Sequence, residues 1–336
     1  MTQSLALAQF EAALQAVESD AASPAEKAEM LMEIAIGLQL RPKTVEPLQH
    51  AIQLYRRALE LCPLDSPLLR ARITTRLGTA LQAMPGGGEQ TLREARSCYE
   101  SALPTLKASG KPEEAAELDM NLGLVLQSLA PSGAARLHDA IQCYHRALRT
   151  FTRDGFAQEF AILHNNLAIA YLSIPLTDER GKMREALAVQ SFEEVLQVIN
   201  LIDHPSEYAM IQNNLGNALQ YSASGHALEN NLRALDAYDE ALKVRNARDT
   251  PFEYANTIAN KANVLRNLPD DPDRPGHGRN AALKEARALY REARELLETL
   301  GQSDQANIVA DALSEIDREL SGRPPRRGNG DAHAHA

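Results

Sequence analysis

The sequence predicts an all-α fold, a right-handed α-solenoid (superhelix) of about six to seven antiparallel helix pairs. Three observations support this prediction. Two short helical motifs alternate along the chain, the distance from the first motif to the second is nearly constant, and a proline stands at a fixed distance before most copies of the second. A helical unit repeated along a chain is typical of solenoids, in which neighbouring units bury one continuous core.

The first motif is an alanine, three residues, an aromatic residue, two residues and a further residue that is usually small. These spacings put the three side chains on one helical face. We call the helices that carry this motif B helices, and the first of them is predicted at the start of the chain. The seven copies centre on Phe10, Tyr55, Tyr99, Tyr144, Phe192, Tyr238 and Tyr290.

The second motif is an apolar residue, a small residue, two residues and another apolar residue. We call these helices A helices. A small side chain lets a neighbouring helix approach closely, while the aromatic side chain of the B helix fills the wider gap. The small residues are Ala35, Gly78, Gly123, Ala168, Gly216 and Ala262. A related pattern at Ser314 predicts a last A helix, a C-terminal cap over residues 305–320.

The spacing of the motifs predicts where the helices begin. The distance from a B aromatic residue to the next A small residue varies only from 23 residues (Tyr55 to Gly78) to 25 (Phe10 to Ala35). Ser23 with Glu26, and Thr250 with Glu253, have the spacing of capping boxes. Proline suits the first turn of a helix, and five prolines stand eleven residues before the small residue. They are Pro24, Pro67, Pro112, Pro205 and Pro251.

Composition excludes several classes of partner. The net charge of −10 disfavours nucleic acid and anionic membrane surfaces, both of which need a basic surface. No apolar run approaches the roughly 20 residues that a membrane-spanning helix needs. The three cysteines are odd in number and widely spaced, which predicts neither a disulfide framework nor a zinc site. A reducing cytoplasm is the compartment that fits this composition.

Together the two motifs resemble the tetratricopeptide repeat (TPR), an antiparallel helix pair of usually 34 residues. Here successive copies lie 43 (Ala35 to Gly78) to 52 (Tyr238 to Tyr290) residues apart. The segment 207–216, followed by 232–244, is similar to a long-repeat bacterial variety found in arrays associated with CHAT domains. Tyr208 and Tyr254 stand where that variety often has tryptophan. The resemblance covers almost all of residues 3–320 and implies protein–protein binding without naming the partner.

The inner wall of such a solenoid is lined by A helices, and side chains just before and after the small residue should face the groove. These positions are rich in amides, although asparagine is a poor residue inside a helix. The amides could pair with the backbone of a bound segment, or could form a ladder that ties neighbouring A helices together. The candidates for partner binding are Asn121, Gln127, Asn165, Asn166, Asn213, Asn214, Asn217, Gln220, Asn260, Asn263 and Arg266.

Arg72 and Arg76 flank the same wall, one helical turn apart. Two such arginines could clamp a carboxylate, and they are similar to part of the carboxylate clamp of chaperone-binding TPR domains. Glu33 stands where that pattern has asparagine. The alternative interpretation is a solvated basic patch.

The sequence carries no pattern of catalytic, cofactor-binding or metal-ligating residues, so we expect neither an enzyme nor a cofactor. The predicted function is a protein-interaction scaffold or adaptor that binds a protein or peptide segment in its concave groove. Two alternatives are an assembly or maturation chaperone for a multi-subunit enzyme, including metalloenzymes, and a regulatory sensor in bacterial signalling. Homo-oligomerisation stays open. Residues 1–320 are predicted to form the solenoid and residues 321–336 a disordered tail.

Overall fold

The computed structural model describes residues 5–19, 21–40, 44–174, 180–221, 226–269 and 278–321. Within these ranges the chain forms fourteen α-helices and one short 3-10 helix, η1 (Ala130–Ser132), with no strand. Its contacts divide it into two compact units, Met1–Ile174 and Pro175–Ala336. The tail predicted at residues 321–336 lies outside the described residues except for Ser321. In the parts described, no helix combines the length and the apolar character needed to cross a membrane.

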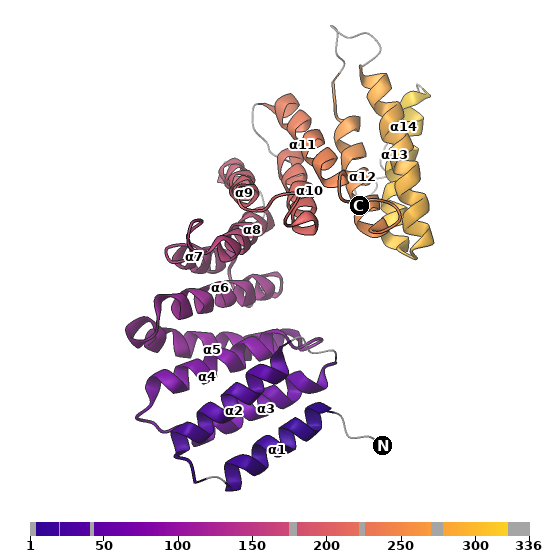
Figure 1. The fold of residues 1–336 in the computed structure, drawn as a ribbon. Coiled ribbons are helices and arrows are strands. Elements are labelled where there is room, and N and C mark those ends of the chain that lie inside the picture. The colour runs from indigo at the N-terminus through magenta and orange to yellow at the C-terminus, as the bar shows by residue number, and fades with distance from the viewer. Residues whose placement is uncertain are drawn as a thin grey trace, which may run out of the picture. The chain divides into compact units, whose positions relative to one another are not determined.

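The first unit begins with a lone B helix, followed by three A–B pairs and a further A helix (Figure 1). Each A helix packs on the B helix that follows it, and each of these B helices packs on the next A helix. Successive A helices also contact one another, which makes them a layer of their own. The helices are α1 (Leu5–Ser19), α2 (Pro24–Gln39), α3 (Glu46–Leu61), α4 (Pro67–Gln82), α5 (Gly88–Ser109), α6 (Pro112–Leu129), α7 (Leu137–Ala147) and α8 (Ala157–Ser173).

The second unit repeats this scheme. A B helix comes first, two A–B pairs follow, and an A helix ends the array. This last helix is the predicted cap, and it begins at Ser303 rather than at residue 305. The helices are α9 (Arg180–Leu196), α10 (Pro205–Tyr221), α11 (Ala227–Leu242), α12 (Pro251–Arg266), α13 (Arg279–Thr299) and α14 (Ser303–Leu320).

The seam between an A helix and its B helix is built from the small and aromatic residues of the two motifs. A Cβ atom added to Gly123 would lie 2.4 Å from Cε1 of Tyr144, and one added to Gly216 would lie 2.6 Å from Cε1 of Tyr238. Both tyrosines are fully buried. Glycine is therefore required at these positions because the aromatic ring occupies the space that a side chain would take.

Helix starts follow the proline pattern, since α2, α4, α6, α10 and α12 each begin at the predicted proline. The capping box at Ser23 forms, with the Ser23 N–H donating to the Glu26 carboxylate at 2.8 Å and the Glu26 N–H donating to the Ser23 hydroxyl at 3.3 Å. The box predicted at Thr250 is wrong. The Thr250 hydroxyl accepts from the N–H of Asn246 at 3.0 Å instead, so it stabilises the preceding turn.

Candidate functional site

Glutamines on the A helices hold the hydroxyl groups of the buried B-helix tyrosines. They stand four residues after the small residue, and their side-chain oxygen accepts the phenolic proton. A buried hydroxyl needs such a partner. Two of these glutamines, Gln127 and Gln220, were predicted to bind a partner. The pairs are Tyr55–Gln39 at 2.9 Å, Tyr99–Gln82 at 2.8 Å, Tyr144–Gln127 at 2.7 Å and Tyr238–Gln220 at 3.2 Å.

Asn217 and Asn263, one residue after the small residue, play a similar part. The Tyr238 hydroxyl has a single proton, which it donates mainly to Asn217 Oδ1 at 2.7 Å, with Gln220 Oε1 as the more distant acceptor. The Tyr290 hydroxyl donates to Asn263 Oδ1 at 3.4 Å. The oxygens of both amides are thus engaged inside the chain. Both side chains are half-buried.

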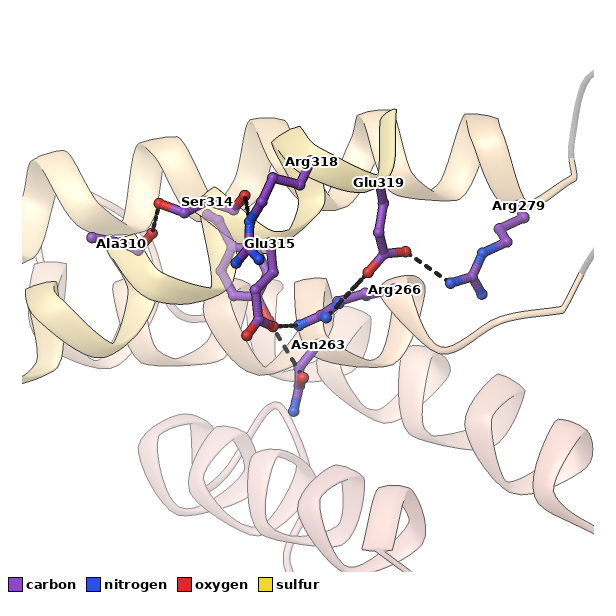
Figure 2. A network of polar contacts seen from close by, with 9 residues as sticks. Asn263, Arg266, Arg279, Ala310, Ser314, Glu315, Arg318 and Glu319 are labelled. Carbon is purple, nitrogen blue, oxygen red and sulfur yellow. Dashed lines mark hydrogen bonds and ion pairs between the residues drawn. The ribbon is translucent and has the colours of Figure 1, made fainter. Parts of the chain in front are cut away.

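Arg266 lies in an ion-pair network that joins α12 to the last helix of the array. Its guanidinium contacts Glu315 at 2.7 Å and Glu319 at 3.1 Å, and Glu319 also contacts Arg279 at 2.8 Å. Figure 2 shows Arg266 reaching both carboxylates of α14. The network gives this predicted binding residue a structural partner.

A rung of the predicted asparagine ladder joins α10 and α12. The Asn260 amide donates to Asn213 Oδ1 at 3.4 Å. Asn213 stands three residues before Gly216, and Asn260 stands two before Ala262. Two more of the predicted amides, Asn121 on α6 and Asn214 on α10, lie half-buried at the same register as Asn260.

The two asparagines of α8 are different. Oδ1 of Asn165 and Nδ2 of Asn166 are buried and make no hydrogen bond to any residue that the structure describes. Asn166 has the register of Asn260, but the position on α6 that corresponds to Asn213 is Met120, three residues before Gly123. A methionine side chain cannot replace the asparagine oxygen of the α10–α12 rung, which explains why no such rung forms here.

The same side of α8 carries exposed apolar side chains. Ile162, Ile169 and Leu172 are 46%, 37% and 37% exposed. Their spacing with Asn165 and Asn166 places all five residues on one stripe of the helix. A patch of this kind offers apolar contacts above a donor and an acceptor that are buried and unpaired.

Arg72 and Arg76 on α4 hold carboxylates of the chain itself. Arg72 donates twice to Glu114 of α6, at 2.7 and 3.1 Å, and Arg76 donates to Glu117 at 3.4 Å. Glu114 also accepts from the N–H of Lys111 at 2.9 Å, so its own helix holds it in place. The hydrogen bond from Arg72 lowers the pKa of Glu114. A partner's carboxylate would have to displace Glu114, and the arginines are no free basic patch.

The two ion pairs form one side of a groove of about 250 Å³ between α2, α4, α5 and α6. Met32, Ile36 and Leu106 supply apolar surface, and Glu29 and Glu33 face the pairs from α2. The groove therefore carries four carboxylates against two guanidinium groups.

Asp119 is a buried residue that the sequence analysis missed. It is 2% exposed on α6 and accepts from Arg146 Nε of α7 at 3.0 Å, while Lys107 of α5 lies 3.4 Å away. The available signal was an aspartate four residues before Gly123 on a strongly apolar helix face. This carboxylate connects three consecutive helices.

The described part of the chain holds no group of three residues arranged to bind a metal ion. Cys62, Cys98 and Cys143 are free thiols, and burial raises the pKa of each, for Cys98 to about 11. A thiol with a raised pKa is a packing group rather than a nucleophile.

No family model matches the sequence, and no curated protein matches it either. Among solved structures, the chain is similar to the C-terminal part of a TPR repeat-containing protein from Cytophaga hutchinsonii, with 15% identity, 90% of this chain and 96% of that chain covered, and a TM-score of 0.48. It is similar to NprR in complex with its cognate peptide NprX, with 14% identity, 95% and 80% covered, and a TM-score of 0.47. It is also similar to the apo form of RapI, with 13% identity, 95% and 99% covered, and a TM-score of 0.47. Its alternating A and B helices and its glycine–tyrosine seams make the chain a TPR-like α-solenoid protein.

Proposed function

We propose that this protein is a non-catalytic scaffold that binds a segment of a partner protein along its A helices. The observation that carries the proposal is the stripe on α8, where Asn165 Oδ1 and Asn166 Nδ2 have no hydrogen-bond partner in the described chain. Exposed Ile162, Ile169 and Leu172 surround them. Other amides of the A helices, Asn217 and Asn263 among them, already bond within the chain.

The physical reason is the cost of unpaired polar groups. A buried donor or acceptor without a partner costs about 1–3 kcal/mol, and a bound segment recovers this cost if the two amides rotate outward to pair with it. A peptide backbone offers one N–H and one C=O per residue, which match an amide oxygen and an amide nitrogen. Apolar side chains of the bound segment would pack on the two isoleucines and the leucine. Because the helices are already folded, the receptor loses little entropy on binding.

Selection of peptides from a displayed random library on the full chain tests the proposal. The dissociation constants of the selected peptides are then compared between the wild type, Ile162→Glu and Ile202→Glu. Ile202 is 88% exposed in the turn before α10, so it controls for the same substitution away from the A helices. We expect Ile162→Glu to weaken binding by roughly tenfold or more, and Ile202→Glu to leave it within about twofold.

Equal binding to the two variants, with both folded by circular dichroism, would refute the role of α8. Failure to select any saturable peptide would refute the scaffold function itself. Substitution of Asn217, Asn263 or Arg266 is a poorer test, because their bonds to tyrosine hydroxyls and glutamates tie the loss of binding to a loss of stability.

A further inference from the structure

We propose a second docking surface, a groove between α1 and α2 that takes an amphipathic α-helix of a partner protein. The groove has a volume of about 450 Å³ and is lined by Gln9, Ala12 and Ala13 of α1 and by Ile34, Gly37 and Leu38 of α2. It corresponds to the place that an A helix fills in the following repeats. The inference is independent of the binding face proposed above, since the residues that line this groove lie on α1 and α2 and none of them on α8.

The A-helix side of the groove is covered in later repeats and open here. Ile34 is half-buried and Gly37 is exposed. The residues at the same register of α4, Leu77 and Ala80, are 5% and 0% exposed. On α6 the equivalent residues Leu122 and Val125 are 4% and 0% exposed.

The B-helix side shows the same difference. Gln9, one residue before the aromatic position, is exposed, whereas the equivalent residues Leu54 and Cys143 are 0% and 3% exposed. The aromatic residue itself also lacks its usual neighbour. Phe10 stacks on His50 of α3, with ring centroids 4.6 Å apart, instead of lying over the small residue of an A helix as Tyr99 does over Gly78.

The next repeat shows what covers such a groove. There α2 contacts both α3 and α4, and so buries the equivalent surface. The groove between α1 and α2 therefore continues an interface that is already formed one repeat further on. Its occupant should have the chemistry of an A helix: apolar residues on one face, with a small residue where the helices come closest. Gly37 leaves room for it, because nothing lies within 4 Å of the position of an added Cβ atom.

A partner protein fits this groove better than a second copy of the chain. The A helix that ends the array, α14, exposes Asn307, Asp311 and Ser314. Asn307 and Ser314 lie on the side where an A helix meets a B helix, at the registers of Ala71 and Gly78 of α4, and Asp311 lies beside that side at the register of Thr75. A polar face of this kind ends a solenoid rather than extending it.

The test uses the full chain and a labelled synthetic peptide of residues 23–40, the helix that covers the equivalent groove in the next repeat. Fluorescence anisotropy gives its dissociation constant for the wild type, Gly37→Glu and Ala12→Glu, and for Gly155→Glu as control. Gly155 lies in an exposed turn, with only Thr152 Oγ1 near an added Cβ, at 3.5 Å. We expect saturable binding that both groove variants weaken by roughly tenfold or more, because each buries a carboxylate, while the control changes it by less than about twofold.

Three results would overturn the proposal. The first is that the wild type does not bind the peptide in a saturable way. The second is that it binds a scrambled peptide of the same composition equally well. The third is that the peptide displaces α2 from its own place in the fold, in which case Gly37→Glu strengthens binding or leaves it unchanged. Ala12 is exposed, so Ala12→Glu keeps the test decisive if Gly37→Glu weakens α2 itself. If Gly37→Glu and Ala12→Glu lose the peptide of residues 23–40 but still bind the library-selected peptides, the groove and the α8 stripe are two separate binding surfaces.

Discussion

Single residues of the two motifs act as matched pairs. The Tyr144 ring takes the volume above Gly123, and its hydroxyl is held by Gln127 four residues further along the same A helix. One tyrosine thus fixes both the distance between two helices and their register. The glycine is a packing requirement and not a flexible point, since it lies inside a regular helix.

A pair of glycine substitutions tests this packing. Gly123→Ala should lower the free energy of unfolding by about 1–3 kcal/mol, because the new methyl group overlaps the Tyr144 ring. Gly37→Ala should raise it by up to about 1 kcal/mol, because open space surrounds this helical position and alanine favours helix. Urea titration followed by circular dichroism measures both. Equal effects of the two substitutions would contradict the packing role.

The thiols give a second test at this scale. Burial raises the pKa of Cys98 to about 11, so little of it is thiolate at neutral pH. Compared with free cysteine, Cys98 should react with a disulfide reagent at pH 8 on the order of a hundredfold more slowly. Comparison of the wild type with Cys98→Ser shows how much of the observed thiol reaction comes from Cys98. Rapid reaction of Cys98 in the folded chain would contradict the burial described here.

Between elements, polar contacts add to the apolar seams. Asp119 of α6 connects to α5 through Lys107 and to α7 through Arg146. The carboxylate is buried while both cations are partly exposed, which lets them remain solvated. The Arg72–Glu114 pair, by contrast, is 40% and 27% exposed and should contribute less than about 1 kcal/mol.

Asp119→Ala should therefore destabilise the protein by about 1–3 kcal/mol through the loss of these charge-assisted hydrogen bonds. Asp154→Ala is the matched control, because the Asp154 side chain is 97% exposed, and its effect should stay within about 0.5 kcal/mol. The double variant Asp119→Ala/Arg146→Ala should lose less free energy of unfolding than the sum of the losses in the two single variants. Strict additivity in thermal or urea unfolding would show that the pair does not interact.

For the molecule as a whole, the buried tyrosines link stability to pH. Burial raises the pKa of Tyr55, Tyr99 and Tyr144 well above the ordinary tyrosine value of about 10. In the unfolded chain these phenols lose their protons near pH 10, whereas in the folded chain they keep them. Their contribution to stability is therefore fully present below about pH 10 and is lost as the pH rises above it.

Urea midpoints measured between pH 8 and pH 11 should accordingly fall at the alkaline end. Absorbance at 295 nm should show these phenols ionising together with unfolding and not before it. Tyr144→Phe should reduce the alkaline loss of stability, since one raised pKa is removed. Ionisation of all tyrosines near pH 10 in a folded chain would contradict the buried positions of their hydroxyl groups.

The helices and their order could be predicted from the sequence because they depend on local spacing. A motif such as Ala140–Tyr144–Ala147 defines a helical face, and a proline such as Pro112 defines where a helix begins. The capping box at Thr250 could not be predicted reliably, because the same hydroxyl can bond to a preceding turn or to the helix that follows. The ion-pair partner of Arg72 could not be predicted either, since Glu114 lies one repeat further along the chain.

An array of alternating A and B helices, with amides gathered on the A helices, therefore follows from the sequence alone. Which amides are engaged depends on the packing of the helices, since the partners come from neighbouring helices: Tyr238 for Asn217, Asn213 for Asn260, and none within the described chain for Nδ2 of Asn166. The tertiary structure likewise revealed the open groove between α1 and α2. The physical reason is that helix formation depends on residues three and four apart, whereas pairing of a side-chain amide depends on the register between helices.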